Sequence, residues 1–144
     1  MSIVTLEDIE ENFDLFETWE DRYSYLIDLG GRLPVMDDAL KTKERMVKGC
    51  VSRVWFDCNI SNNEDGAEVF CLVADSDAMI VKGLIYLIML AYNGKSISEI
   101  PNIDIKSSFE KLGLGKHLSP NRRNGFFSMV EYINAYVKEC VCKR

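Results

Sequence analysis

Positions 52–60 read Ser52-Arg53-Val54-Trp55-Phe56-Asp57-Cys58-Asn59-Ile60. Every second residue from Val54 to Ile60 is apolar, and a two-residue period of this kind predicts a β-strand with one buried face. The next six residues, 61–66, are the polar turn formers Ser-Asn-Asn-Glu-Asp-Gly, and a second β-rich run covers Ala67 to Ala74. Two such runs joined by a short turn predict an antiparallel hairpin.

A hairpin is marginally stable by itself, so helices must cover one of its faces. The sequence supplies a helix from Asp77 to Tyr92 that is apolar nearly all round and that Asn93-Gly94 ends. Asp75 or Ser76 is the expected N-cap, because carboxylate and hydroxyl groups accept hydrogen bonds from the first N–H groups of a helix.

Further helices are predicted on both sides of the hairpin. They comprise a helix capped by Thr5, a helix from Trp19 to Leu29 that Thr18 caps and Gly30-Gly31 ends through left-handed backbone, a brief helix at Ser107 to Leu112, and a long final helix after Ser119-Pro120. Residues 35–48 are charged and irregular, which predicts a loop with one helical turn near Asp37 to Lys41. We therefore predict one α+β domain over residues 1–144, with a small antiparallel sheet packed against helices.

Composition narrows the class of function. The chain has 144 residues, 47% of them hydrophobic, and its 23 acidic and 17 basic residues give a net charge of −6. This charge disfavours nonspecific binding to nucleic acid or anionic lipid, so a protein partner is expected. The longest strongly apolar run, Gly83 to Tyr92, is too short to cross a membrane. Five cysteines and no basic-then-apolar leader predict a reduced, cytoplasmic protein.

Cys50 is the candidate for chemistry, because it lies in a turn of small residues just before the first strand. A loop held by a rigid element can present a reactive atom to a partner. Lys48 and Arg53 in sequence, and Arg122 in space, are the cations that could favour its thiolate. The alternative is that Cys50 is a small buried hydrophobic residue without chemistry.

The other sulfur and imidazole groups suggest a second hypothesis. Cys58 and Cys71 lie on the two predicted strands and could face each other, while His117 is the only histidine. A metal-binding cluster scaffold would use Cys50, Cys58 and Cys71 together with His117, although their spacing matches no familiar ligand motif. A noncatalytic interaction domain is a third possibility.

Four segments in order resemble the SufE family of sulfur-acceptor proteins of iron–sulfur cluster assembly. They are Leu26-Ile27-Asp28-Leu29-Gly30-Gly31-Arg32-Leu33-Pro34, Val47-Lys48-Gly49-Cys50-Val51-Ser52-Arg53-Val54-Trp55, Asp75-Ser76-Asp77-Ala78-Met79-Ile80-Val81-Lys82-Gly83-Leu84 and residues 112–125, which read Leu-Gly-Leu-Gly-Lys-His-Leu-Ser-Pro-Asn-Arg-Arg-Asn-Gly.

The resemblance implies that Cys50 accepts the sulfur and that Arg122, in the pattern Leu-Ser-Pro-x-Arg-x-x-Gly, supports it. It also implies a fold similar to IscU-type scaffolds and no cofactor in this chain. The implied donor is a cysteine desulfurase of the SufS type, which carries pyridoxal phosphate and which the acceptor stimulates. The implied recipient is a cluster scaffold of the SufB type. Val51 departs from the family, which often has glutamine directly after the cysteine.

Overall fold

Two nine-residue strands, β1 (Val54–Asn62) and β2 (Glu68–Ser76), form the predicted hairpin. The computed structural model describes residues 5–143. The strands pair antiparallel from Val54↔Ser76 to Asn62↔Glu68. The turn is closed by Asn63, whose side-chain oxygen accepts hydrogen bonds from the backbone N–H groups of Asp65 and Ala67. β1 begins and ends two residues later than the predicted strand from Ser52 to Ile60, and β2 begins one residue later and ends two residues later than the predicted run from Ala67 to Ala74.

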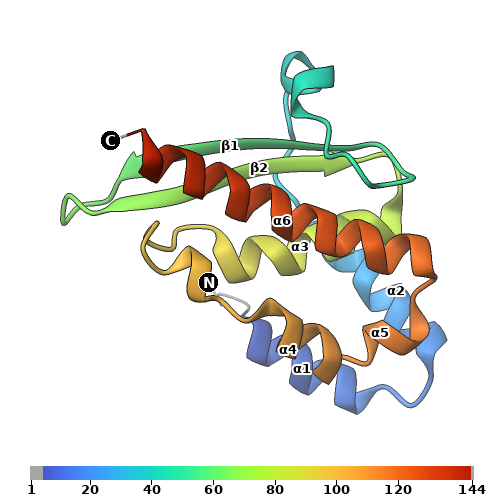
Figure 1. The fold of residues 1–144 in the computed structure, drawn as a ribbon. Coiled ribbons are helices and arrows are strands. Elements are labelled where there is room, and N and C mark those ends of the chain that lie inside the picture. Colours follow the sequence, from blue (N-terminus) through green and yellow to red (C-terminus); the bar gives the residue numbers. More distant parts are fainter. Residues whose placement is uncertain (1–4, 144) are drawn as a thin grey trace.

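One face of the hairpin carries the core. Val54, Phe56, Phe70 and Leu72 are almost completely buried on this face, and two helices cover it: α3 (Met79–Tyr92) and α6 (Pro120–Cys142). Figure 1 shows α6 running along the hairpin, with α3 beside it. Aromatic rings connect these layers. The ring of Phe56 meets that of Tyr132 edge-on at 5.7 Å between centroids.

The start of α3 differs from the prediction. Residues 75 and 76 do not cap it, because they continue β2 and Ser76 pairs with Val54. The helix begins at Met79 after Ala78, which gives no side-chain cap. The Asp75 carboxylate instead pairs with the ammonium group of Lys41, at 2.9 Å.

Two helices precede the hairpin: α1 (Leu6–Leu15) and α2 (Trp19–Gly30), capped by Thr5 and Thr18 as predicted. Gly31 keeps right-handed helical backbone with φ of −66°, so the predicted left-handed ending is wrong. Gly30 has another role, because α2 packs directly on α3 at this point. A Cβ on Gly83 would lie 2.2 Å from the backbone oxygen of Leu26, so the two helix backbones touch.

The remaining elements are short. They are the 3-10 turns η1 (Asp38–Leu40), η2 (Lys43–Arg45) and η3 (Ile100–Asn102), and the helices α4 (Ile105–Lys111) and α5 (Leu114–His117). The first matches the predicted turn near Asp37 to Lys41. The predicted helix at Ser107 to Leu112 begins earlier, at Ile105, because Asp104 caps it.

The predicted α+β class is confirmed. Within residues 5–143, six α-helices and one two-stranded antiparallel sheet share a single hydrophobic core. No helix in this part of the chain combines the length and the apolar character that a bilayer crossing requires.

Candidate functional site

The loop of residues 46–53 holds Cys50 between two fixed ends. At its start, the Val47 N–H donates to the Val54 carbonyl at 2.9 Å. At its end, the backbone of Arg53 makes three hydrogen bonds: its N–H donates to Asp77 Oδ1 at 3.0 Å, and its carbonyl accepts from Ser76 Oγ at 2.7 Å and from the Asp77 N–H at 3.2 Å. The loop is therefore anchored on β1 and on the junction between β2 and α3.

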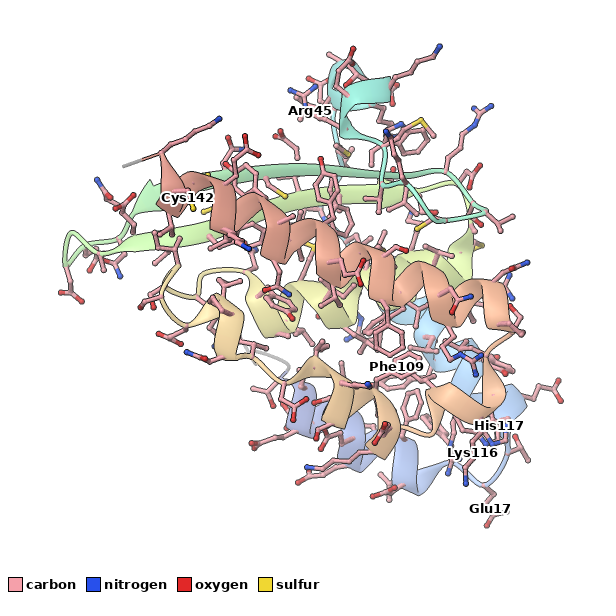
Figure 2. The ribbon with its side chains drawn as sticks, in the orientation of Figure 1. Glu17, Arg45, Phe109, Lys116, His117 and Cys142 are labelled. Carbon is pink, nitrogen blue, oxygen red and sulfur yellow. The ribbon has the colours of Figure 1, made fainter. Side chains whose placement is uncertain are left out.

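Two further ion pairs fasten the segment before the loop. Arg45 pairs with Asp57 on β1 at 3.0 Å, and Lys41 pairs with Asp75 on β2. Burial is the largest single effect and would raise the pKa of Asp75, but the hydrogen bonds from Lys41 and the Ser76 N–H and the charges of Lys82 and Lys41 together lower it. These contacts hold the segment against the hairpin, and Figure 2 labels Arg45 above β1.

Glycine is required where the loop meets α6. Gly49 has φ of +92°, a conformation that side chains disfavour, and a Cβ there would lie 2.5 Å from Ser128 Oγ. Across the contact, a Cβ on Gly125 would lie 3.4 Å from Cys50 Sγ. The absence of both Cβ atoms allows the loop to lie directly on the first turns of α6.

Cys50 is half-buried in this arrangement. Its Sγ donates to the backbone carbonyl of Gly125 at 3.5 Å. Beside it is a cavity of about 30 Å³, and the other residues that line it are Val51, Ser52, Val81, Leu84, Asn121, Arg122, Phe126 and Met129. A space of this size is on the order of one water molecule. Most of the lining is apolar.

Burial raises the pKa of the Cys50 thiol above its ordinary value. The resting side chain is therefore a protonated thiol at neutral pH, and the carbonyl of Gly125 suits this form because it can only accept a hydrogen bond. Burial is the effect that acts on this thiol, and Lys48, Arg53 and Arg122 do not offset it in this arrangement. Ionisation becomes easier when the thiol leaves the apolar cavity.

Arg122 lies where the sequence analysis places it, at the same cavity as Cys50. Ser119 caps α6 by accepting from the Arg122 N–H at 3.3 Å, so the arginine lies in the first turn, about one turn before Gly125. Its side chain is exposed. A guanidinium group here can meet an anion at the mouth of the cavity.

The other candidates do not join Cys50. In the register of the hairpin Cys58 is opposite Leu72 and Cys71 is opposite Asn59. The two thiols therefore do not face each other, although the sequence allowed that arrangement. Burial raises the pKa of Cys58 to about 12, with smaller effects from Asp57 and Cys140. Over residues 5–143, no three cysteine, histidine or carboxylate side chains gather as a metal would need. This arrangement speaks against the metal-scaffold hypothesis.

His117 is also separate from the thiol. Its ring stacks on Trp19 with 3.8 Å between the centroids and 16° between the planes. Its backbone carbonyl accepts a hydrogen bond from the hydroxyl of Tyr23. Figure 2 shows it at the α5 end of the molecule, with Cys142 at the opposite end of α6. The imidazole therefore serves packing in this structure, and the hydrogen-bond acceptor of Cys50 is the carbonyl of Gly125.

Sequence reasoning missed three residues that position the loop. Ser76 and Asp77 were predicted as helix-start residues, but they bind the backbone of Arg53. Gly125 was only part of a motif, although its carbonyl and its missing Cβ shape the place of Cys50. The short polar run 75–77 was the available signal, because such side chains bind backbone groups in loops as readily as in caps.

Comparison with known proteins agrees with this geometry. The model of the family described as SufE, the Fe-S metabolism associated domain, matches residues 7–137. An uncharacterized SufE-like protein from Rhizobium meliloti is 38% identical over 133 residues, which are 92% of this chain and 94% of that protein. Another SufE-like protein, from Rhizobium etli, is 38% identical over 136 residues, 94% of this chain and 91% of its own.

A solved structure shows the same fold. The solution structure of a hypothetical protein from Thermus thermophilus superposes with a TM-score of 0.73, covering 95% of this chain and 96% of its own at 16% identity. The chain belongs to the SufE family. Family membership associates it with sulfur transfer in iron–sulfur metabolism and with a cysteine desulfurase as partner.

Proposed function

We propose that this protein takes sulfur from a cysteine desulfurase of the SufS type onto Cys50 and delivers it to a cluster scaffold of the SufB type. The observation that carries the proposal is a single half-buried thiol on an anchored loop, beside a small apolar cavity that Arg122 also lines. By this proposal the protein stimulates the desulfurase without being a complete enzyme. It works in the reducing cytoplasm, where its cysteines stay unpaired.

The transfer is an exchange between sulfur atoms. The Cys50 thiolate attacks the outer sulfur of the persulfide on the desulfurase, forming a new S–S bond while the old one breaks. The bonding pair leaves on the donor cysteine, which becomes a thiolate, and the proton on the outer sulfur remains there. Delivery repeats the same step, with a thiolate of the recipient attacking the sulfur on Cys50. No external oxidant or reductant is needed.

The site supports an ionisation that is linked to binding of the partner. In the cavity the thiol is neutral and donates to Gly125, so it is a poor nucleophile. Movement of residues 49–52 away from α6 removes the apolar surroundings and lowers the pKa of Cys50. The exposed guanidinium of Arg122 is then placed to stabilise a sulfur anion at the mouth of the cavity. Pyridoxal phosphate stays with the desulfurase, so this chain would need no cofactor.

Intact-mass analysis tests the proposal. The protein is incubated with a cysteine desulfurase and free cysteine, and wild type is compared with Cys50→Ser and with Cys142→Ser. Cys142 is exposed and distant, so it is the matched control for nonspecific sulfur loading. We expect a gain of one sulfur mass in wild type and in Cys142→Ser, and none in Cys50→Ser. Equal loading of all three would show that Cys50 is not the acceptor.

A further inference from the structure

The surroundings of Cys50 differ in charge from the rest of the molecule. Three segments, residues 46–53, 78–84 and 113–125, contribute to the lining of the Cys50 cavity or of the neighbouring groove that Arg122 also lines, and we call them together the Cys50 rim. In a chain with 23 acidic residues the rim contains no aspartate or glutamate. It contains six cations: Lys48, Arg53, Lys82, Lys116, Arg122 and Arg123. By contrast, residues 5–31 hold nine acidic residues and a single cation, Arg22.

Little of this positive charge is neutralised inside the protein. In the described part of the chain, Lys82 is the rim cation with an ion pair, to Asp75 at 3.6 Å. Asp77 lies at the border of the rim, but its carboxylate accepts from the backbone N–H of Arg53. Figure 2 places Glu17 near Lys116, at the outer edge of this surface. Five of the six rim cations therefore have no ion pair among the described residues, and they outnumber the neighbouring carboxylates of Asp77 and Glu17.

Exposed apolar side chains accompany the cations. Val51 is 79% exposed and Met79 is 60% exposed, so two large hydrophobic side chains of the rim face solvent. Met79 also lines a groove of about 410 Å³ that continues from the Cys50 cavity, since Arg122 belongs to both linings. Tyr23, Ile27 and Ile80 supply the walls of this groove.

We propose that the Cys50 rim binds an acidic segment of the desulfurase, one of whose apolar side chains enters the groove beside Met79. This proposal rests on the proposed function, because the occupant is the sulfur donor. Opposite charges raise the rate of encounter and orient the partners, and the apolar contact holds them once water is expelled. The donor persulfide is thereby brought to the loop that carries Cys50.

The test measures binding of the purified desulfurase to two variants that change net charge equally. Arg53→Glu/Lys116→Glu reverses two exposed rim cations, neither of which has an ion pair among the described residues. Lys95→Glu/Lys138→Glu reverses two exposed lysines near the far ends of α3 and α6, about 20 Å from Cys50 along each helix. Dissociation constants are measured at several salt concentrations, and the extent of Cys50 alkylation by a neutral reagent at completion is measured without the desulfurase.

We expect Arg53→Glu/Lys116→Glu to weaken binding at low salt by at least about tenfold and to flatten its salt dependence, since exposed charges act through a screened field. The control should change affinity by less than about twofold. The extent of Cys50 alkylation by the neutral reagent should be similar in wild type and both variants, which shows that the thiol remains accessible. Val51→Ser/Met79→Ser should weaken binding without changing the salt dependence.

Three results would overturn the proposal. Equal affinity and salt dependence for rim and control variants, with sulfur transfer intact in wild type, would refute the acidic contact and leave the proposed function standing. Salt-sensitive self-association of wild type that the rim variant abolishes would assign the rim to a second copy, through its acidic residues 5–31. Failure of wild type to bind or take sulfur from any desulfurase would refute the proposed function as well.

Discussion

Replacement of Gly49 by alanine should release the Cys50 loop. The backbone φ of +92° places this residue in a region that costs an alanine roughly 1–2 kcal/mol. The new Cβ would also lie 2.5 Å from Ser128 Oγ, and such overpacking adds about 1 kcal/mol. Together these two costs destabilise the loop packed against α6 by about 2–3 kcal/mol. At about 1.4 kcal/mol for each factor of ten, the population of the released loop rises about 30- to 150-fold.

Alkylation of Cys50, followed by mass spectrometry of its peptide at neutral pH, measures this population. The released thiol is both accessible and easier to ionise, so Gly49→Ala should be modified faster by a similar factor while the helices stay folded. Gly66→Ala is the matched control: φ is +80° there, nothing lies within 4 Å of its added Cβ, and the residue lies in the hairpin turn. Cys50 should react at the wild-type rate in that variant.

The double variant Gly49→Ala/Ser128→Gly separates the two costs. Removing the Ser128 side chain relieves the clash but leaves the backbone cost, so the alkylation rate should fall part of the way back toward wild type. If Gly49→Ala left the alkylation rate of Cys50 unchanged, the loop would not be held by the contact with α6, and the reasoning about this site would be refuted.

Three further predictions concern the fold and the loop anchors. Gly83→Ala should lower the free energy of unfolding in urea by about 2–3 kcal/mol, because the new Cβ would press on the backbone of Leu26. This cost exceeds the gain from the better helix propensity of alanine. In the control Gly115→Ala the nearest contact of the new Cβ is 3.7 Å away, so the free energy of unfolding should change by less than about 1 kcal/mol. Ser76→Ala removes a buried hydroxyl that donates to the Arg53 carbonyl, so it should cost about 1–3 kcal/mol and speed Cys50 alkylation, and an unchanged rate would contradict the anchor. Burial raises the pKa of Cys58 to about 12 in the folded state, whereas its ordinary pKa is about 8.5. The stability that Cys58 contributes is therefore complete below about pH 8.5 and is lost as the pH rises toward 12. Cys58→Val should lessen the alkaline loss of stability in pH-dependent denaturation, and equal slopes for the two proteins would show that Cys58 does not cause it.

The sequence predicted the elements well where a local pattern determines them. The alternation from Val54 to Ile60 and the turn at 61–66 define the hairpin, and Thr5, Thr18 and Ser119 cap helices at the expected positions. These features depend on residues that are close in the chain. Short-range periodicity therefore contains enough information to place them.

The prediction failed where a distant segment competes for the same residue. Ser76 was expected to cap α3, but pairing with Val54 draws it into β2, and Asp75 turns to Lys41. Gly30 was expected, with Gly31, to end α2 through left-handed backbone, yet the absence of its side chain is what allows α3 to pack closely on α2. No local pattern reports such contacts, because the partner residues lie more than twenty positions away in the chain.

The candidate site was likewise predicted only in part from the sequence. The choice of Cys50 as the proposed acceptor follows from the motif around it, and the choice of Arg122 from its place after Ser119-Pro120. The state of the thiol could not be predicted from neighbours in sequence, because Lys48 and Arg53 suggest a thiolate while burial against Gly125 keeps a proton on the sulfur. Desolvation depends on the packing of α3 and α6, which only the tertiary structure gives.

The contact between Gly83 and Leu26 has a mechanical consequence for this site. Val81 and Leu84, one wall of the Cys50 cavity, lie on the same turn of α3 as Gly83, whose backbone is pressed against α2. That wall has no room to shift, and α6 forms a second wall, whereas the remaining side is the loop of residues 46–53, which is attached at its two ends. Motion that exposes the sulfur is therefore expected in the loop and not in α3.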